Sequence, residues 1–108
     1  MSMTIVVTRN VPARFRGFLA SCMLELTPGV YTAPRMNKAV RERIWRVLRE
    51  WWEQDPGRSI VMTWADRSQR SGQSIRILGA PPIELVEVQG IFLSKKPVSP
   101  ELTYEDLL

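Results

Sequence analysis

The segment at residues 3–31 reads MTIVVTRNVPARFRGFLASCMLELTPGVY, and its pattern decides the fold. Its residues 4–8 (TIVVT) are all β-branched, which favours a buried strand. Pro12 suits the first position of a helix, with Asn10 or Val11 as the residue that caps it. The segment therefore predicts a strand that leads almost directly into a helix.

Two arginines, Arg14 and Arg16, follow at the start of the predicted helix, and no carboxylate precedes them. The N-terminus of a helix attracts anions because its first backbone N–H groups have no partner within the helix. A catalytic site at this point would instead need a general base or a metal ligand. The pattern predicts a phosphate-binding site, with no catalytic residue and no metal ligand.

The rest of the chain alternates between apolar helical spacing and short strands. Residues 36–53 carry one apolar stripe and form the strongest predicted helix. Pro28-Gly29 interrupts a strand predicted at residues 24–31, and we interpret this dipeptide as a bend or bulge. Further strands are predicted at residues 59–65, 74–78, 83–88 and 91–93.

This order, β-α-β-α-β-β-β, predicts an α+β fold: a ferredoxin-like sheet with both helices on one face and an added C-terminal strand. The other face would then expose Val, Ile, Met and Trp side chains. Because large apolar patches usually mark interfaces, we expect a homodimer that forms through the sheets. Residues 1–93 are the predicted domain. Residues 94–108 are a predicted flexible tail, with a docking peptide for a second protein as the alternative.

The composition narrows the classes of function. The net charge is +4, and twelve of the fifteen cations are arginine, which favours nucleic acid as a partner. Residues 1–83 carry 13 Lys/Arg against 6 Asp/Glu, whereas residues 84–108 carry 2 against 5. The chain has no histidine and a single cysteine, Cys22, so a histidine base and a Cys-based metal site are excluded.

Several other residues could have either a functional or a purely structural role. We expect Cys22 on the buried side of the first helix. The four tryptophans are expected in the core or an interface rather than as base-stacking platforms. Asp66 could bind a metal, but we expect it to cap a loop, and we expect Glu25 to be exposed. No membrane span or signal peptide is predicted, so we expect a cytoplasmic protein.

A set of motifs resembles CRISPR-associated protein 2 of type I-E systems. The motifs are IVVTRNVP (5–12), RFRG (14–17), GVY (29–31), IW (44–45) and VMTWA (61–65). The resemblance extends over residues 3–93.

The resemblance implies a homodimer that lies between dimers of the CRISPR integrase, CRISPR-associated protein 1. It implies a non-catalytic scaffold that holds a double-stranded DNA spacer precursor for insertion, with Arg14 and Arg16 on the phosphates. Further predicted nucleic-acid contacts are Lys38, Arg41 and Arg76. The predicted integrase-binding residues are Ile91, Phe92, Leu93, Tyr104 and Leu107.

Two alternatives stay open. Members of this family are also described as Mg²⁺-dependent endonucleases that use an aspartate near the end of the first strand. Here that position is Arg9, which cannot replace a carboxylate ligand, so no cofactor is predicted unless the nuclease alternative holds. A single-strand RNA binder ranks last, because Ile5, Val6 and Val7 give the central strand no aromatic residue for base stacking.

Overall fold

The computed structural model describes residues 2–95, which form two helices and seven strands. The elements, in chain order, are β1 (Ser2–Arg9), α1 (Ala13–Cys22), β2 (Leu24–Thr27), β3 (Val30–Met36), α2 (Lys38–Gln54), β4 (Ser59–Ala65), β5 (Gln73–Gly79), β6 (Glu84–Val88) and β7 (Ile91–Lys95). Part of the predicted tail, residues 96–108, lies outside this range.

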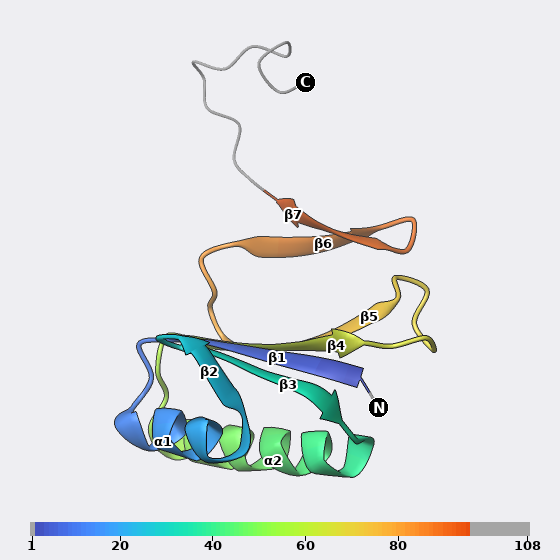
Figure 1. Cartoon of the computed structure of the whole chain (residues 1–108). Helices are drawn as coiled ribbons and strands as arrows, with labels where there is room; N and C mark the ends of the chain where they lie inside the picture. Colours follow the sequence, from blue (N-terminus) through green and yellow to red (C-terminus); the bar gives the residue numbers. More distant parts are fainter. Residues whose placement is uncertain (1, 96–108) are drawn as a thin grey trace, which may run out of the picture.

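Five strands make one antiparallel sheet in the order β2-β3-β1-β4-β5. Both helices cover the same face of this sheet, and the β6–β7 hairpin lies on the opposite side (Figure 1). The order β2-β3-β1-β4 within it is that of a ferredoxin-like sheet. The predicted α+β fold with two helices on one face is therefore confirmed.

The strand predicted at residues 24–31 is two strands, so its interpretation as one bent strand was wrong. Thr27 pairs with Val30 across Pro28-Gly29, which makes this dipeptide the turn of the β2–β3 hairpin. Gly29 has a φ of 83°, a conformation that glycine adopts without steric cost. β3 then continues to Met36. Proline lacks the N–H group that a ladder needs, but the β1–β3 pairing shifts register beside Pro34, so the strand can contain this residue.

The C-terminal strands also differ from the prediction. They do not extend the main sheet, whose added strand is β5; β6 and β7 instead form their own two-stranded sheet. Gly79 has a φ of 81°, and Pro81 and Pro82 cannot donate to a ladder. The chain therefore leaves the sheet after β5 and turns over its helix-free face (Figure 1).

The helix ends differ in smaller ways. α1 begins at Ala13 with Pro12 at the N-cap and no side-chain cap, so the predicted capping by Asn10 or Val11 was wrong. α2 begins at Lys38, where the Asn37 side chain accepts a 2.8 Å hydrogen bond from the N–H of Val40. Cys22 is exposed rather than buried, because α1 ends there and the next residue, Met23, takes the inward position.

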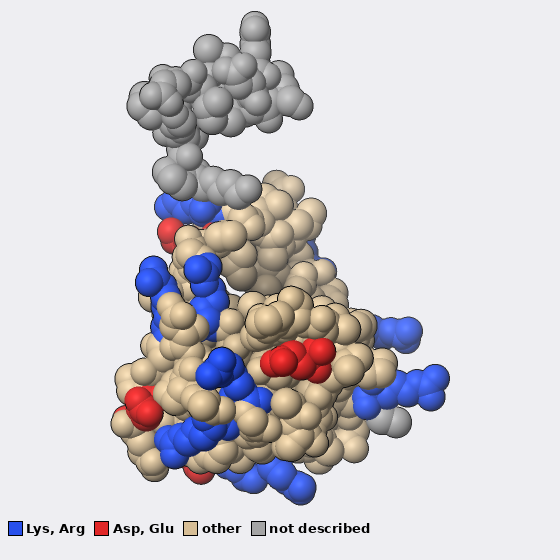
Figure 2. Space-filling model, turned by 60° about the vertical axis from the view of Figure 1, so that its left-hand side comes forward, with Lys and Arg blue, Asp and Glu red and all other residues tan. Residues whose placement is uncertain are grey.

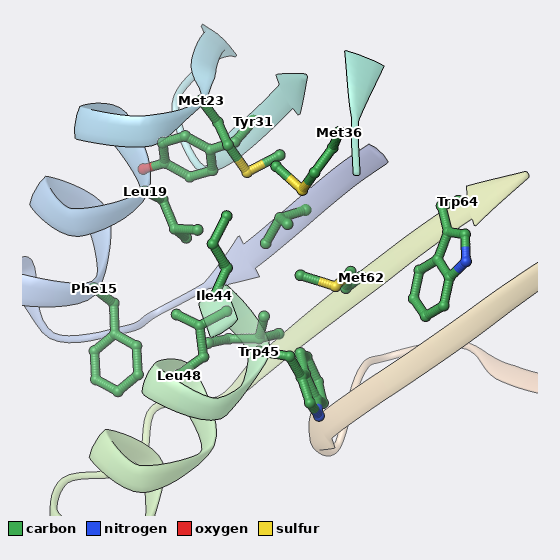
Figure 3. Packing of buried hydrophobic residues seen from close by; sticks show 12 residues of the cluster. Phe15, Leu19, Met23, Tyr31, Met36, Ile44, Trp45, Leu48, Met62 and Trp64 are labelled. Atoms are coloured by element: carbon green, nitrogen blue, oxygen red, sulfur yellow. The ribbon is translucent and has the colours of Figure 1, made fainter. Parts of the chain in front are cut away.

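The core lies between the helices and the sheet (Figure 3). Fully buried side chains come from both layers: Val6, Phe15, Leu19, Tyr31, Leu48, Ile60 and Met62. The prediction for the tryptophans is confirmed, since Trp45 and Trp64 are buried and Trp51 and Trp52 pack against the same cluster. Glu25 is exposed, as expected.

Gly29 has a steric role that can be tested against Gly72. Both have a φ above 80°, but a Cβ at Gly29 would lie 2.9 Å from the Thr8 carbonyl oxygen, whereas one at Gly72 would meet nothing within 4 Å. In both Gly→Ala variants the free energy of unfolding should fall by about 1 kcal/mol, because alanine is strained in the left-handed backbone conformation. Gly29→Ala should lower the free energy of unfolding by about 1 kcal/mol more, because its Cβ would be too close to Thr8. Denaturant unfolding measures both losses, and equal losses would contradict the steric role.

Candidate nucleic-acid interface

The junction between β1 and α1 is fixed by backbone hydrogen bonds. The N–H of Arg58 lies 3.2 Å from the carbonyl oxygen of Arg9 and 3.1 Å from that of Asn10, and it donates to both. The N–H of Thr8 donates to the carbonyl of Gly29 at 2.7 Å. Asn10 has a φ of 49°, which asparagine tolerates better than most residues. These contacts set the direction in which α1 leaves the sheet.

Arg14 and Arg16 are both exposed on the first turns of α1. The guanidinium carbon of Arg14 lies 4.8 Å from the centre of the Trp51 ring, and its Nη2 donates to the Trp51 carbonyl at 3.4 Å. Arg16 lines a hollow of about 340 Å³ together with Thr8 and Gly29. Both arginines therefore lie beside the β1–α1 junction, where a ligand can reach them.

The other three predicted contacts, Lys38, Arg41 and Arg76, line a separate cavity of about 400 Å³. Arg41 is only 8% exposed, and its guanidinium carbon lies 4.1 Å from the centre of the Trp64 ring. Its Nε has no hydrogen-bond partner in the described structure. Arg76 binds the Glu42 carboxylate through two hydrogen bonds of 2.7 and 2.8 Å.

The structure therefore divides the five predicted cations into two groups. Lys38 begins α2, whereas Trp51, the partner of Arg14, lies thirteen residues further along the same helix. At 1.5 Å per residue, Lys38 is about 20 Å from Trp51 along the helix axis, and Arg41 and Glu42, the partner of Arg76, are about 15 Å from it. Figure 2 brings the left-hand side of Figure 1 forward and shows Lys and Arg side chains at several places on it, with an Asp or Glu side chain near the middle of the view.

At the end of β1, the cationic Arg9 is surrounded by apolar side chains. Arg9 lines a cavity of about 320 Å³ with apolar residues of the sheet and of the segment that leads into β6, among them Val61, Ile77 and Ile83. Within residues 2–95 there is no cluster of three or more His, Cys, Asp or Glu side chains that could hold a metal ion. The described surface at this position thus offers no set of carboxylate ligands.

Asp66 is held by the loop that it caps. Its Oδ1 accepts hydrogen bonds from the N–H and the hydroxyl of Ser68, at 3.0 and 2.6 Å, and its Oδ2 accepts one from the Ser74 hydroxyl at 2.7 Å. The hydrogen bonds from Ser68 and Ser74 hold the pKa of Asp66 below its usual value. The expected capping role is confirmed, and both carboxylate oxygens already have partners.

Tyr31, from β3, lies beneath the arginine side of α1. Burial, and after it the neighbouring Glu25, raise the pKa of its hydroxyl to about 12, while Arg16 acts in the opposite direction. Tyr31 is therefore neutral at physiological pH, and it supplies core volume rather than charge.

The predicted integrase-binding residues divide between two sides of β7. Ile91 and Leu93 are 60% and 50% exposed, whereas Phe92 is half-buried and lines the cavity beside Arg41. Tyr104 and Leu107 lie outside the described residues. Neither α1 nor α2 has both the length and the apolar character that a membrane-crossing helix needs.

Two partners of the predicted arginines, Trp51 and Glu42, were not expected from the sequence. Trp51 was expected in the core or an interface, and Glu42 had no predicted role. These partners lie 37 and 34 residues from Arg14 and Arg76. No local spacing signals contacts over such separations, and only the pairing of elements reveals them.

The ion pair between Arg76 and Glu42 makes stability depend on pH. The hydrogen bonds from Arg76 lower the pKa of Glu42 from its usual 4.5. A carboxyl group whose pKa is lower in the folded state stabilises the fold above the unfolded pKa, and this contribution is lost as the pH falls through the lowered value. Glu42→Gln should therefore have a lower Tm than the wild type above about pH 4.5, with the gap closing in acid.

The control for this titration is Glu50→Gln, at an exposed glutamate of α2 without an ion pair in the described structure. Thermal unfolding followed by circular dichroism at several pH values measures both gaps. A Glu42→Gln gap that stays constant down to strong acid would contradict the role of the ion pair.

The comparison with known families gives one clear match. The model of a family described as CRISPR-associated protein (Cas_Cas2CT1978) matches residues 3–93 of the 108-residue chain. This range coincides with the part of the sequence that carries the resemblance to CRISPR-associated protein 2, while the type I-E branch stays a prediction. Because the match covers most of the chain, the protein belongs to this CRISPR-associated, Cas2-like family.

Proposed function

We propose that this protein is a non-catalytic, DNA-binding scaffold of the CRISPR adaptation complex, which holds duplex spacer DNA between integrase dimers. The observation that carries the proposal is the pair of exposed arginines, Arg14 and Arg16, on the first turns of α1. Guanidinium groups bind phosphate oxygens through two parallel hydrogen bonds. Contacts of this kind position a duplex without reading its bases, which suits a subunit that must accept many sequences.

The proposal includes a homodimer that forms through the helix-free face of the sheet. Met3 and Val7 of β1 and Ile77 of β5 are 49%, 36% and 40% exposed. In β1, Thr4, Val6 and Thr8 are buried while Met3, Val7 and Arg9 are exposed, so the apolar side chains of this face lie outside the core. Burying such side chains against a second copy is favourable, and the two-fold axis would double the pair formed by Arg14 and Arg16.

The Mg²⁺-dependent endonuclease has weaker support. Magnesium in proteins is usually held by carboxylates. Arg9 occupies the end of β1, and both oxygens of the Asp66 carboxylate accept hydrogen bonds from serines. Cleavage by the purified protein that disappears with EDTA, and with Asp66→Asn, would restore this alternative.

Removal of the two arginines should weaken duplex binding. For Arg14→Ala/Arg16→Ala we expect a fall in affinity of roughly tenfold or more at physiological salt. The plot of log K against log salt concentration should become shallower by about 0.9 for each phosphate that the protein no longer neutralises. Fluorescence anisotropy with a labelled DNA duplex measures both, and an integration assay with the integrase should show a corresponding decrease in spacer insertion.

The matched control removes two other exposed arginines, Arg35 near the end of β3 and Arg67 just after β4. Both strands end beside the start of β1, at the opposite end of the sheet from the β1–α1 junction. It changes the net charge equally, so a general electrostatic effect would appear in both variants. The proposal is contradicted if Arg14→Ala/Arg16→Ala binds DNA and supports insertion as well as this control.

The homodimer can be tested with one substitution on each side of the molecule. Val7→Asp places a charge on the helix-free face and should convert the dimer to monomer, because an unpaired carboxylate in an apolar interface is costly. Val40→Asp is the control, since Val40 is similarly exposed, at 39%, but lies on α2. Sedimentation velocity measures the mass of each. A dimeric Val7→Asp variant would refute the proposed interface.

A further inference from the structure

We propose that Trp51 is a positioning residue for Arg14: the guanidinium stacks on its indole ring, which holds it in an orientation that can bind a phosphate. This inference rests on the proposed function, because it assumes that Arg14 contacts DNA. It adds a residue from α2 to the pair of arginines on α1.

The contact between the two side chains has two components. The guanidinium carbon of Arg14 lies 4.8 Å from the centre of the Trp51 ring, within the range of a cation–π interaction. Nη2 also donates to the backbone carbonyl of Trp51 at 3.4 Å. The stack and the hydrogen bond together restrict the side-chain torsions of an arginine that is otherwise exposed.

The indole ring of Trp51 is itself held in place by aromatic side chains of α1. Phe15 meets the Trp51 ring edge-on, with centroids 5.6 Å apart and an interplanar angle of 86°. Phe18 approaches it at 5.3 Å and 65°. Trp51 is half-buried between these contacts, so its ring cannot swing away without breaking the packing of α1 on α2.

This arrangement leaves Arg14 free to bind. A guanidinium has five N–H donors, and only one is used on the Trp51 carbonyl. An arginine stacked by one face keeps its edges available for the two parallel hydrogen bonds that a phosphate accepts. Because its torsions are already restricted, binding immobilises less freedom, and the affinity gained for each hydrogen bond is greater.

Arg16 provides the comparison within the molecule. In the described structure it stacks on no aromatic ring and borders an open hollow instead. The two arginines should therefore respond differently when the guanidinium is replaced by an ammonium, which keeps the charge but cannot stack as a plane.

The experiment measures the affinity of the full-length protein for a fluorescein-labelled DNA duplex over a series of salt concentrations. Trp51→Leu should weaken binding roughly three- to tenfold, the range expected when a side chain must be ordered on binding. It should also lower the salt slope by up to about 0.9 per Arg14 site. The double variant Trp51→Leu/Arg14→Ala should bind no more weakly than Arg14→Ala alone.

The control is Trp52→Leu. Trp52 packs on the same cluster and meets Phe15 at 6.3 Å, but no arginine stacks on its ring in the described part of the chain. Both substitutions should lower the Tm, whereas only Trp51→Leu should change the salt slope. In NMR spectra of the free protein, the Arg14 Hδ resonances should be shifted upfield by the indole ring, and Trp51→Leu but not Trp52→Leu should remove that shift.

Arg14→Lys and Arg16→Lys keep the test decisive if Trp51→Leu does not fold. Arg14→Lys should weaken binding nearly as much as Arg14→Ala, while Arg16→Lys should be milder than Arg16→Ala. Unchanged binding by Arg14→Ala would remove the phosphate contact of the proposed function, and this inference with it. Three outcomes would contradict the positioning role alone. Arg14→Ala could weaken binding while Trp51→Leu does not, or the losses caused by Trp51→Leu and Arg14→Ala could add in the double variant. The third outcome is an Arg14→Lys variant that binds like the wild type.

Discussion

The site depends on one constraint, the fixed exit of the chain from β1 into α1. Arg58, which precedes β4, donates its N–H to the carbonyls of Arg9 and Asn10, so the junction is held by a segment almost fifty residues away in sequence. The Thr8–Gly29 hydrogen bond fixes the same end from the β2–β3 turn. With its start held on both sides, α1 can place exposed arginines at a defined point on the surface. A looser junction would carry the same charges without a fixed geometry.

The cations of this protein have different roles according to what lies beside them. Arg41 and Arg76 stack on Trp64 at 4.1 and 5.0 Å, and Arg76 is also paired with Glu42. Arg14 stacks on Trp51 but keeps an exposed guanidinium. Part of the positive charge therefore joins α2 to the sheet, and part remains available to a ligand. A count of basic residues cannot separate these roles, because both need the same side chain.

The two faces of the sheet also have different partners. Helices cover one face well enough to bury Val6, Ile60 and Met62, whereas within residues 2–95 the other face is covered by the β6–β7 hairpin alone. This leaves an apolar cavity of about 320 Å³ between the hairpin segment and the sheet, and exposed apolar side chains on β1 and β5. A helix-free face of this kind is the physical basis for the proposed dimer, because a second copy can cover what one chain leaves open.

The elements with local signals were predictable from the amino-acid sequence. The β-branched run at residues 4–8 predicted β1, the apolar stripe predicted α2, and the arginines of α1 stood out by their position at a helix start. Residues 24–31 failed as one strand, since a Pro-Gly pair fits a bulge and a hairpin turn equally well until the pairing of Thr27 with Val30 is known. The folded structure was needed to reveal the separate β6–β7 hairpin, the Arg76–Glu42 pair and the stacking of Arg14 on Trp51. These contacts join residues more than thirty positions apart or depend on where a chain turns after a break, and no periodicity in the sequence encodes such distances.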